Sequence, residues 1–148
     1  MANEENNNIR EYKLIEPIGT IDLSIYKDFI KFEILTDELV LTKDRAKHID
    51  DRRFGVLDSY KDNIIETVNA PDYIIRDKKN PDNTLIAIKK VQTIENKHTY
   101  IVIRFVIEGD NPKYKNSIIT MTAIGDKKLG QIKRNKELLF SKDELEES

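Results

Sequence analysis

The spacing of hydrophobic residues changes from helical to alternating near Pro71. Between residues 57 and 68, apolar side chains recur every three or four positions, which predicts a helix that Pro71 ends. Between residues 99 and 107, isoleucine and phenylalanine alternate with other side chains, which predicts a strand with one buried face. Further strands are predicted over residues 12–15, 30–34, 39–41, 73–76, 84–91, 117–124 and 138–140.

Helical segments are also expected elsewhere in the chain. Thr42 is a suitable N-cap for a helix over residues 43–53. Residues 24–29 are expected to form one or two helical turns, and residues 127–135 a short helix or an extended turn. The segment 108–116 is expected to be a loop. Because helices come before a run of sequential strands, this order favours an α+β domain with an antiparallel sheet.

The composition narrows the chemistry that the chain can perform. Its 148 residues are enough for one domain with one sizeable core. The absence of cysteine excludes disulfides and thiolate catalysis, and two histidines alone make a zinc site improbable. Residues 1–8 have no signal-peptide character and no run of 18 apolar residues occurs, so we expect no membrane span and a cytoplasmic protein of a bacterial host. Neither a glycine-rich phosphate loop nor a serine-nucleophile motif is present, and no cofactor is expected.

Charge is distributed unevenly along the chain. The net charge is −2, but residues 43–142 carry 21 cations and 14 anions. Residues 1–42 carry four cations and nine anions, and residues 143–148 carry four anions. A basic middle segment attracts phosphate groups, and the attraction weakens with salt. A solvated surface of mixed charge explains the same distribution equally well.

The helix predicted over residues 43–53 contains the grouping best suited to catalysis. At about 100° per residue, Arg45, His48 and Arg52 fall within about 60° of arc. Arg53 lies nearby. RNA cleavage without a metal needs a base for the 2′-OH proton, an acid for the leaving oxygen and cations for the phosphorane. His48 suits the acid or base role and the arginines suit phosphate binding, although an exposed helix face with ion pairs is the alternative.

Arg104 interrupts the apolar strand predicted over residues 99–107. Alternation places it on the same face as Tyr100 and Val102, opposite a wholly apolar face. A cation within so apolar a run is costly to bury unless it is paired or belongs to a site. Arg104 is therefore a candidate phosphate ligand, with a salt bridge to a carboxylate such as Asp72 or protection of a sheet edge as the alternatives.

Strand hydroxyls provide a second kind of phosphate ligand. Strict alternation places Thr120 and Thr122 on one face of their strand together with Ile118, and Ser117 on the other face. A threonine that faces the same cleft as Arg104 can bind phosphate. Threonine is also simply a good strand former, which is the alternative for both positions.

Four more positions are weaker candidates. Lys89 and Lys90 end their strand on opposite faces, so only one of them can face a shared site, and solvated lysines are the alternative. His98 is expected in a surface loop. Tyr114 is a candidate for stacking on a base.

Several short motifs occur in a specific order between residues 39 and 142. They are LTKDRAKHIDDR at 41–52, PDYI at 71–74, the lysine pair at 89–90, Arg104, DNP at 110–112 and NSIIT at 116–120. Together they resemble the phage-associated nuclease families of the barnase–EndoU–colicin–RelE group. Residues 1–38 lie outside the resemblance.

The resemblance implies a metal-independent ribonuclease in which one or two N-terminal helices pack on an antiparallel sheet of four or five strands. By matching position, His48 and Arg52 would be active-site residues of the helix. Arg104 would contact phosphate from the sheet, and Thr120 would supply the hydroxyl. The substrate-binding candidates are Arg45, Arg53, Lys90, Ser117 and Tyr114.

The resulting hypothesis is an endoribonuclease of a phage or mobile element that produces a 2′,3′-cyclic phosphate without metal or cofactor. In the resembling families a histidine follows the arginine of the helix, whereas this chain has Arg53, which favours a module that binds RNA or protein without cleaving it. A third hypothesis is an inhibitor or host-takeover protein whose acidic ends contact a host protein. The expected organisation is an N-terminal extension over 1–38, partly disordered, a nuclease-like domain over 39–142 and an acidic tail over 143–148.

Overall fold

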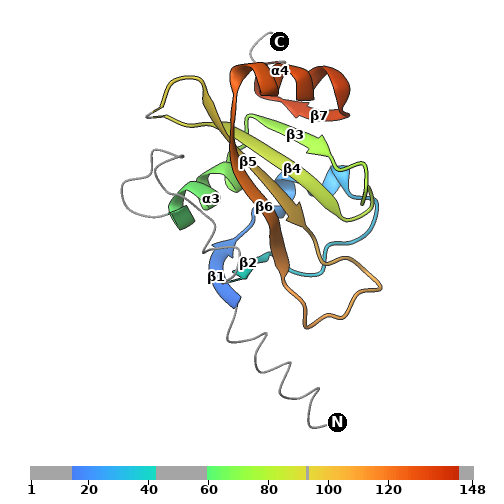
Figure 1. Ribbon diagram of the computed structural model, residues 1–148. Helices are drawn as coiled ribbons and strands as arrows, with labels where there is room; N and C mark the ends of the chain where they lie inside the picture. Colours follow the sequence, from blue (N-terminus) through green and yellow to red (C-terminus); the bar gives the residue numbers. More distant parts are fainter. Residues whose placement is uncertain (1–14, 43–59, 93, 144–148) are drawn as a thin grey trace.

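The computed structural model describes residues 15–42, 60–92 and 94–143 of the chain (Figure 1). These residues form seven β-strands, two α-helices and two short 3₁₀ helices. The strands are β1 (Ile15–Thr20), β2 (Glu38–Thr42), β3 (Tyr73–Arg76), β4 (Thr84–Lys90), β5 (Lys97–Arg104), β6 (Asn116–Gly125) and β7 (Leu138–Ser141). The helices are η1 (Leu23–Ile25), η2 (Lys27–Phe29), α3 (Tyr60–Asn69) and α4 (Asp126–Asn135).

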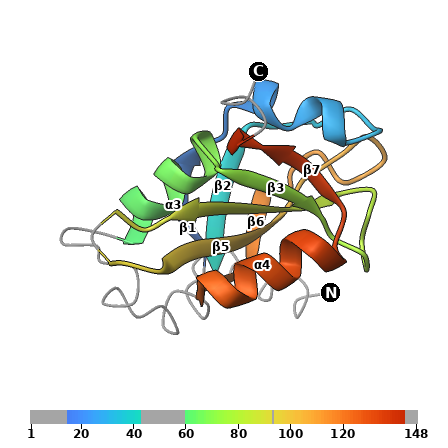
Figure 2. The ribbon, with the colours of Figure 1, turned by 90° about the horizontal axis from the view of Figure 1, so that it is seen from above.

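All seven strands belong to one sheet with the order β1-β2-β6-β5-β4-β3-β7. Strands β3 to β6 are sequential antiparallel neighbours. β1 and β2 extend the sheet on one side, where β2 runs parallel to β6, and β7 pairs with β3 on the other side. Figure 2 shows α3 and α4 on opposite faces of this sheet.

The expected arrangement of N-terminal helices on an antiparallel sheet of four or five strands is therefore wrong. The sheet is mixed, it has seven strands, and α4 follows six of them along the chain. The expectation failed because β2 and β7 are short strands that pair with partners far away in the sequence. Local hydrophobic spacing identifies a strand but carries no information about such distant pairing.

The larger hydrophobic core closes one face of the sheet. Every second residue of the central strands points to this face, including Ile101 and Ile103 of β5, which are both 0% exposed. Ile64 of α3 packs on it, and so does Tyr26, which lies between η1 and η2 and donates its hydroxyl hydrogen to the carbonyl of Val68. Burial raises the pKa of Tyr26. Residues 15–42 thus contribute to the same core as the later strands.

A smaller core lies on the opposite face beneath α4. Leu129 and Ile132 of α4 pack against Ile86, Ile88 and Ile124, which occupy the alternate positions of the same central strands. Figure 1 shows α4 leaving the end of β6 and running toward β7, away from the first half of β6. The apolar residues on this face are therefore concentrated where α4 lies.

Most predicted elements coincide with observed ones, but three strands differ. The strand predicted over 12–15 shares only Ile15 with β1, which continues through Pro17 and Gly19 to Thr20. The segment 30–34 forms only an isolated bridge from Ile34 to Ile107, because it runs beside the chain beyond β5 and makes few ladder hydrogen bonds. β5 ends at Arg104 instead of continuing to residue 107, because the amide of Val106 donates to the side chain of Asn116 and its carbonyl accepts from the amide of Leu35. The helix predicted over 43–53 lies outside the described residues.

Gly19 allows α3 to pack closely on β1. The pairing of β1 with β2 shifts register between Pro17 and Gly19, and Gly19 has a φ of +156°, which glycine adopts at little cost. A Cβ at this position would lie 2.7 Å from Cδ1 of Ile65 on α3. The missing side chain therefore provides the space that Ile65 occupies.

Candidate functional site

The exposure of one sheet face increases along β5 and β6 with distance from the start of α4. Along β5 the residues of this face change from buried to exposed in the order His98, Tyr100, Val102, Arg104. Along β6 the residues Ile124, Thr122 and Thr120 change in the same way. We call the exposed end the open half of the sheet, made of Val102, Arg104, Ser117, Thr120 and Thr122.

The register of β5 and β6 brings three of the predicted site residues together. Arg104 is the direct cross-strand partner of Ser117, and Val102 is the partner of Thr120. Partners in an antiparallel pair project to the same face of the sheet. Arg104, Ser117 and Thr120 therefore share the open half, where Arg104 and Thr120 are exposed and Ser117 is half-buried.

The expected grouping of Thr120 with Ile118, and of Ser117 with the opposite face, is wrong. Thr120 pairs with Val102, but Ile118 pairs with Ile103, so the register shifts between these two pairs. Such a shift leaves one extra residue on β6 and reverses the faces of the residues before it. Ile118 consequently points into the larger core, while Ser117 joins Thr120 on the open half.

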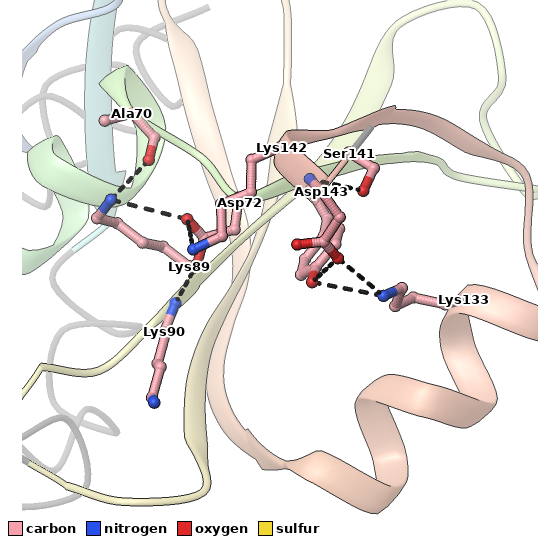
Figure 3. A network of polar contacts seen from close by, with 9 residues as sticks. Ala70, Asp72, Lys89, Lys90, Lys133, Ser141, Lys142 and Asp143 are labelled. Atoms are coloured by element: carbon pink, nitrogen blue, oxygen red, sulfur yellow. Dashed lines mark hydrogen bonds and ion pairs between the residues drawn. The ribbon is translucent and has the colours of Figure 1, made fainter. Parts of the chain in front are cut away.

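The alternative in which Arg104 pairs with Asp72 is also wrong. The Asp72 carboxylate is buried and accepts a 2.8 Å hydrogen bond from the backbone amide of Lys90 (Figure 3). Its ion-pair partners are Lys142 at 3.3 Å and Lys89 at 3.9 Å. This network joins β3, β4 and the end of β7. Arg104 takes no part in it and ends β5 as an exposed cation.

Two predicted substrate-binding residues lie outside the open half, one far from it and one near it. Lys90 is the cross-strand partner of His98, which is six residues from Arg104 on β5, or about 20 Å along the strand. Tyr114 belongs to the loop between β5 and β6, three residues before Ser117, and is 62% exposed. The structure thus separates Lys90 from the open half and keeps Tyr114 near it.

Arg45, His48, Arg52 and Arg53 lie outside the described residues. The acid–base role predicted for His48 is therefore a matter for experiment.

His98 is a buried strand residue, and the prediction that it lies in a surface loop is wrong. It is 7% exposed, and its Nε2 atom lies 2.7 Å from the carboxylate of Asp126, the first residue of α4. Its Nδ1 atom has no hydrogen-bond partner among the described residues. The alternation seen at Tyr100 and Val102 extends back to His98, and this signal in the sequence was missed. The pair connects α4 to β5 and does not reach the open half.

The two faces of the sheet also differ in charge. From residue 113 to residue 136, a stretch that includes β6 and α4, the chain has seven cations and one anion. Residues 15–42, which pack partly on the closed face, have two cations and six anions. Lys127, Lys128 and Arg134 of α4 are exposed. α4 therefore adds three exposed cations to the face that carries the open half.

The open half offers hydrogen-bond donors but no proton acceptor that titrates near neutrality. Burial, and secondly the charge of Asp77, raise the pKa of Tyr100, which borders this surface. Arginine and aliphatic hydroxyls keep their protons at neutral pH. Among the described residues, this surface is thus suited to binding an anion, and acid–base chemistry on it requires a group from another part of the chain.

Within the same described part of the chain, no group of three or more His, Cys, Asp or Glu side chains is placed to hold a metal ion. None of its helices is long and apolar enough to cross a membrane. Comparisons with family profiles, with curated protein sequences and with solved structures give no match.

Proposed function

We propose that this protein binds RNA on the open half of its sheet. The observation that supports the proposal is the direct pairing of Arg104 with Ser117, with Thr120 exposed beside them. A guanidinium donates paired hydrogen bonds to phosphate oxygens, and hydroxyls add neutral donors. All three residues belong to strands, which hold binding groups more rigidly than loops do.

The charge around the open half favours a polyanion. Lys127, Lys128 and Arg134 of α4 are exposed on the same face, so their charge attracts phosphate groups before contact. RNA is preferred to DNA because the hydroxyls of Ser117, Thr120 and Thr122 can exchange hydrogen bonds with a ribose 2′-OH, which DNA lacks.

The test compares a short labelled RNA with DNA of the same sequence in fluorescence anisotropy. Arg104→Gln should weaken RNA binding by roughly 10- to 100-fold, because it removes a charged hydrogen bond to phosphate. The matched control is Lys27→Gln, which removes an exposed cation of η2 on the other face. Equal affinity of wild-type and Arg104→Gln protein for RNA would contradict the proposal.

Metal-independent RNA cleavage is a second candidate function. The observation that favours it is the course of β2, which runs parallel to β6 with Val40 beside Ser117. β2 ends at Thr42, two residues after Val40, and His48 follows Thr42 by six residues in the sequence. His48 would then act as base or acid, while Arg52 and Arg104 stabilise the phosphorane and Thr120 orients the phosphate.

Cleavage is tested by incubating total bacterial RNA with the protein in EDTA and analysing the product ends. Products with 2′,3′-cyclic phosphate that vanish in His48→Ala, and a rate that titrates near neutrality, are the expected results. If the folded protein binds RNA but does not cleave it, the cleavage function is excluded and the binding function is supported. Arg53, in the position of a second histidine, would then explain the absence of catalysis. Efficient cleavage of DNA would exclude the 2′-OH mechanism. Binding to a host protein that survives Arg104→Gln would favour a protein partner.

A further inference from the structure

Tyr114 is an aromatic residue that lies outside both hydrophobic cores. Of the residues that the structure describes, only Leu35 and Tyr114 are large hydrophobic residues with exposed side chains, at 40% and 62%. Lys113 and Lys115 flank Tyr114 and are also exposed, and the Lys115 ammonium forms an ion pair with Glu38. An exposed ring between two cations is a common arrangement for contacting a nucleobase and its phosphates.

The loop that carries Tyr114 is held in place by side-chain hydrogen bonds. Asn116, which is fully buried, accepts a 2.7 Å hydrogen bond from the amide of Val106 and donates one of the same length to the carbonyl of Thr36. Asn111 accepts hydrogen bonds from the amides of Lys113, through its side chain, and of Tyr114, through its carbonyl. The backbone at Tyr114 is therefore fixed before any ligand arrives, which lowers the entropy cost of stacking.

Tyr114 is also close enough to the open half to act on the same ligand. Tyr114 lies three positions before Ser117, so their Cα atoms lie at most about 11 Å apart. Ser117 in turn is the direct partner of Arg104. A strand whose phosphates contact Arg104 and Ser117 can therefore extend toward the Tyr114 ring.

We infer that the open half takes single-stranded RNA, with one base stacked on Tyr114 and the neighbouring phosphates on Arg104 and Ser117. The inference rests on the proposed RNA binding and specifies its substrate. In a duplex the bases are stacked on one another and paired, so none is free to lie against an exposed ring. In a single strand every base presents a face to an aromatic side chain, and stacking is tolerant of sequence.

The experiment measures the affinity for a single-stranded RNA, for the blunt duplex of the same sequence and for the same single strand made abasic. The wild-type protein should prefer the single strand. Tyr114→Ala should weaken binding to it by about 5- to 150-fold, and Tyr114→Phe should retain the affinity because the ring remains. On the abasic strand, Tyr114→Ala and wild-type protein should bind equally. Leu35→Ala, a change at the other exposed apolar residue, is the matched control.

The failure of this inference is distinguishable from the failure of RNA binding itself. Unchanged affinity in Tyr114→Ala, an equal loss on the abasic strand, or binding of the duplex as tight as that of the single strand would overturn the stacking of a base. Loss of binding in Arg104→Gln would still support the proposed function in each of these cases. Folded wild-type protein that binds none of the three nucleic acids would overturn both.

Discussion

The closed face and the open half of the sheet are built from the same strands but differ in covering, charge and chemistry. On β5, Ile101 and Ile103 are fully buried in the larger core, whereas Arg104 on the opposite face is exposed. The apolar side chains of the closed face continue from strand to strand beneath α3, η1 and η2. On the other face the apolar residues are concentrated beneath α4, and the open half consists of one half-buried valine together with arginine, serine and threonine.

This difference shows how one strand can serve stability and binding at once. Successive side chains of β5 point to opposite faces, so Ile101 and Ile103 belong to the larger core. The even-numbered residues point to the other face, where they are buried near α4 and exposed away from it. Substitutions on the two faces should therefore separate into those that change the free energy of unfolding and those that change binding.

The largest expected effect comes from truncating a side chain on the closed face. Ile101→Ala removes a 0% exposed side chain and should lower the free energy of unfolding by about 2–5 kcal/mol, through lost burial and the cavity that remains. Thr120→Ala on the open half should change it by less than about 0.5 kcal/mol. Urea denaturation of both variants measures the difference. Comparable losses in the two variants would show that the open half is part of the stabilising core.

The next largest effect should come from Gly19, where α3 meets β1 on the closed face. Gly19→Ala places a methyl group 2.7 Å from Cδ1 of Ile65 and should destabilise the fold by about 1–3 kcal/mol. Ile65→Val removes that Cδ1 atom, so the double variant should recover part of the loss. A double-mutant cycle in urea measures the coupling. Strict additivity of the two losses would mean that the backbone at Gly19, and not the contact with Ile65, is responsible.

How far each face could be predicted depends on how local its signal is. The strand over residues 73–76 was predicted with its observed bounds, and β4 within a residue, because apolar runs between turn residues are a local feature. Arg104 and Thr120 were candidates because polar side chains stand out in apolar strands, and the structure brings them together. Whether they bind RNA stays a prediction.

The rest depends on information that hydrophobic spacing does not carry. The shift of register on β6 moves Ser117 to the open half. A shift of one residue cannot be recognised from the types of residue in the strand, so it was not predicted. The parallel pairing of Val40 with Ser117 joins segments that lie far apart in the sequence, so the number of strands and the mixed sheet were missed. His98 was placed in a loop because its side chain is polar. It nevertheless continues the alternation of β5, in which it shares a face with Tyr100 and Val102.

A smaller effect should appear at alkaline pH in the part of the sheet that α4 covers. Burial, followed by the hydrogen bond that Tyr73 donates to Asp143 at 2.8 Å, raises the pKa of Tyr73 to about 12. The unfolded chain, in which tyrosine titrates near pH 10, loses this proton first, so the stability is fully present below about pH 10 and is lost as the pH rises toward about 12. Tyr73→Phe should therefore have a lower Tm at neutral pH but a smaller decrease in Tm across this interval. Parallel Tm curves for the two proteins would contradict the assignment.

The smallest effect should come from Lys128, a cation on the same face as the open half but outside it. Lys128 is exposed on α4, about 140° around the helix from Lys133, whose ammonium contacts the ring of Tyr73. Lys128→Gln should weaken RNA binding only a few-fold at low salt, because it removes long-range attraction and no fixed hydrogen bond. The loss should fade as salt increases, whereas the loss in Arg104→Gln should persist. A loss in Lys128→Gln that persists at high salt would mean that RNA contacts α4 directly and that the binding surface extends beyond the open half.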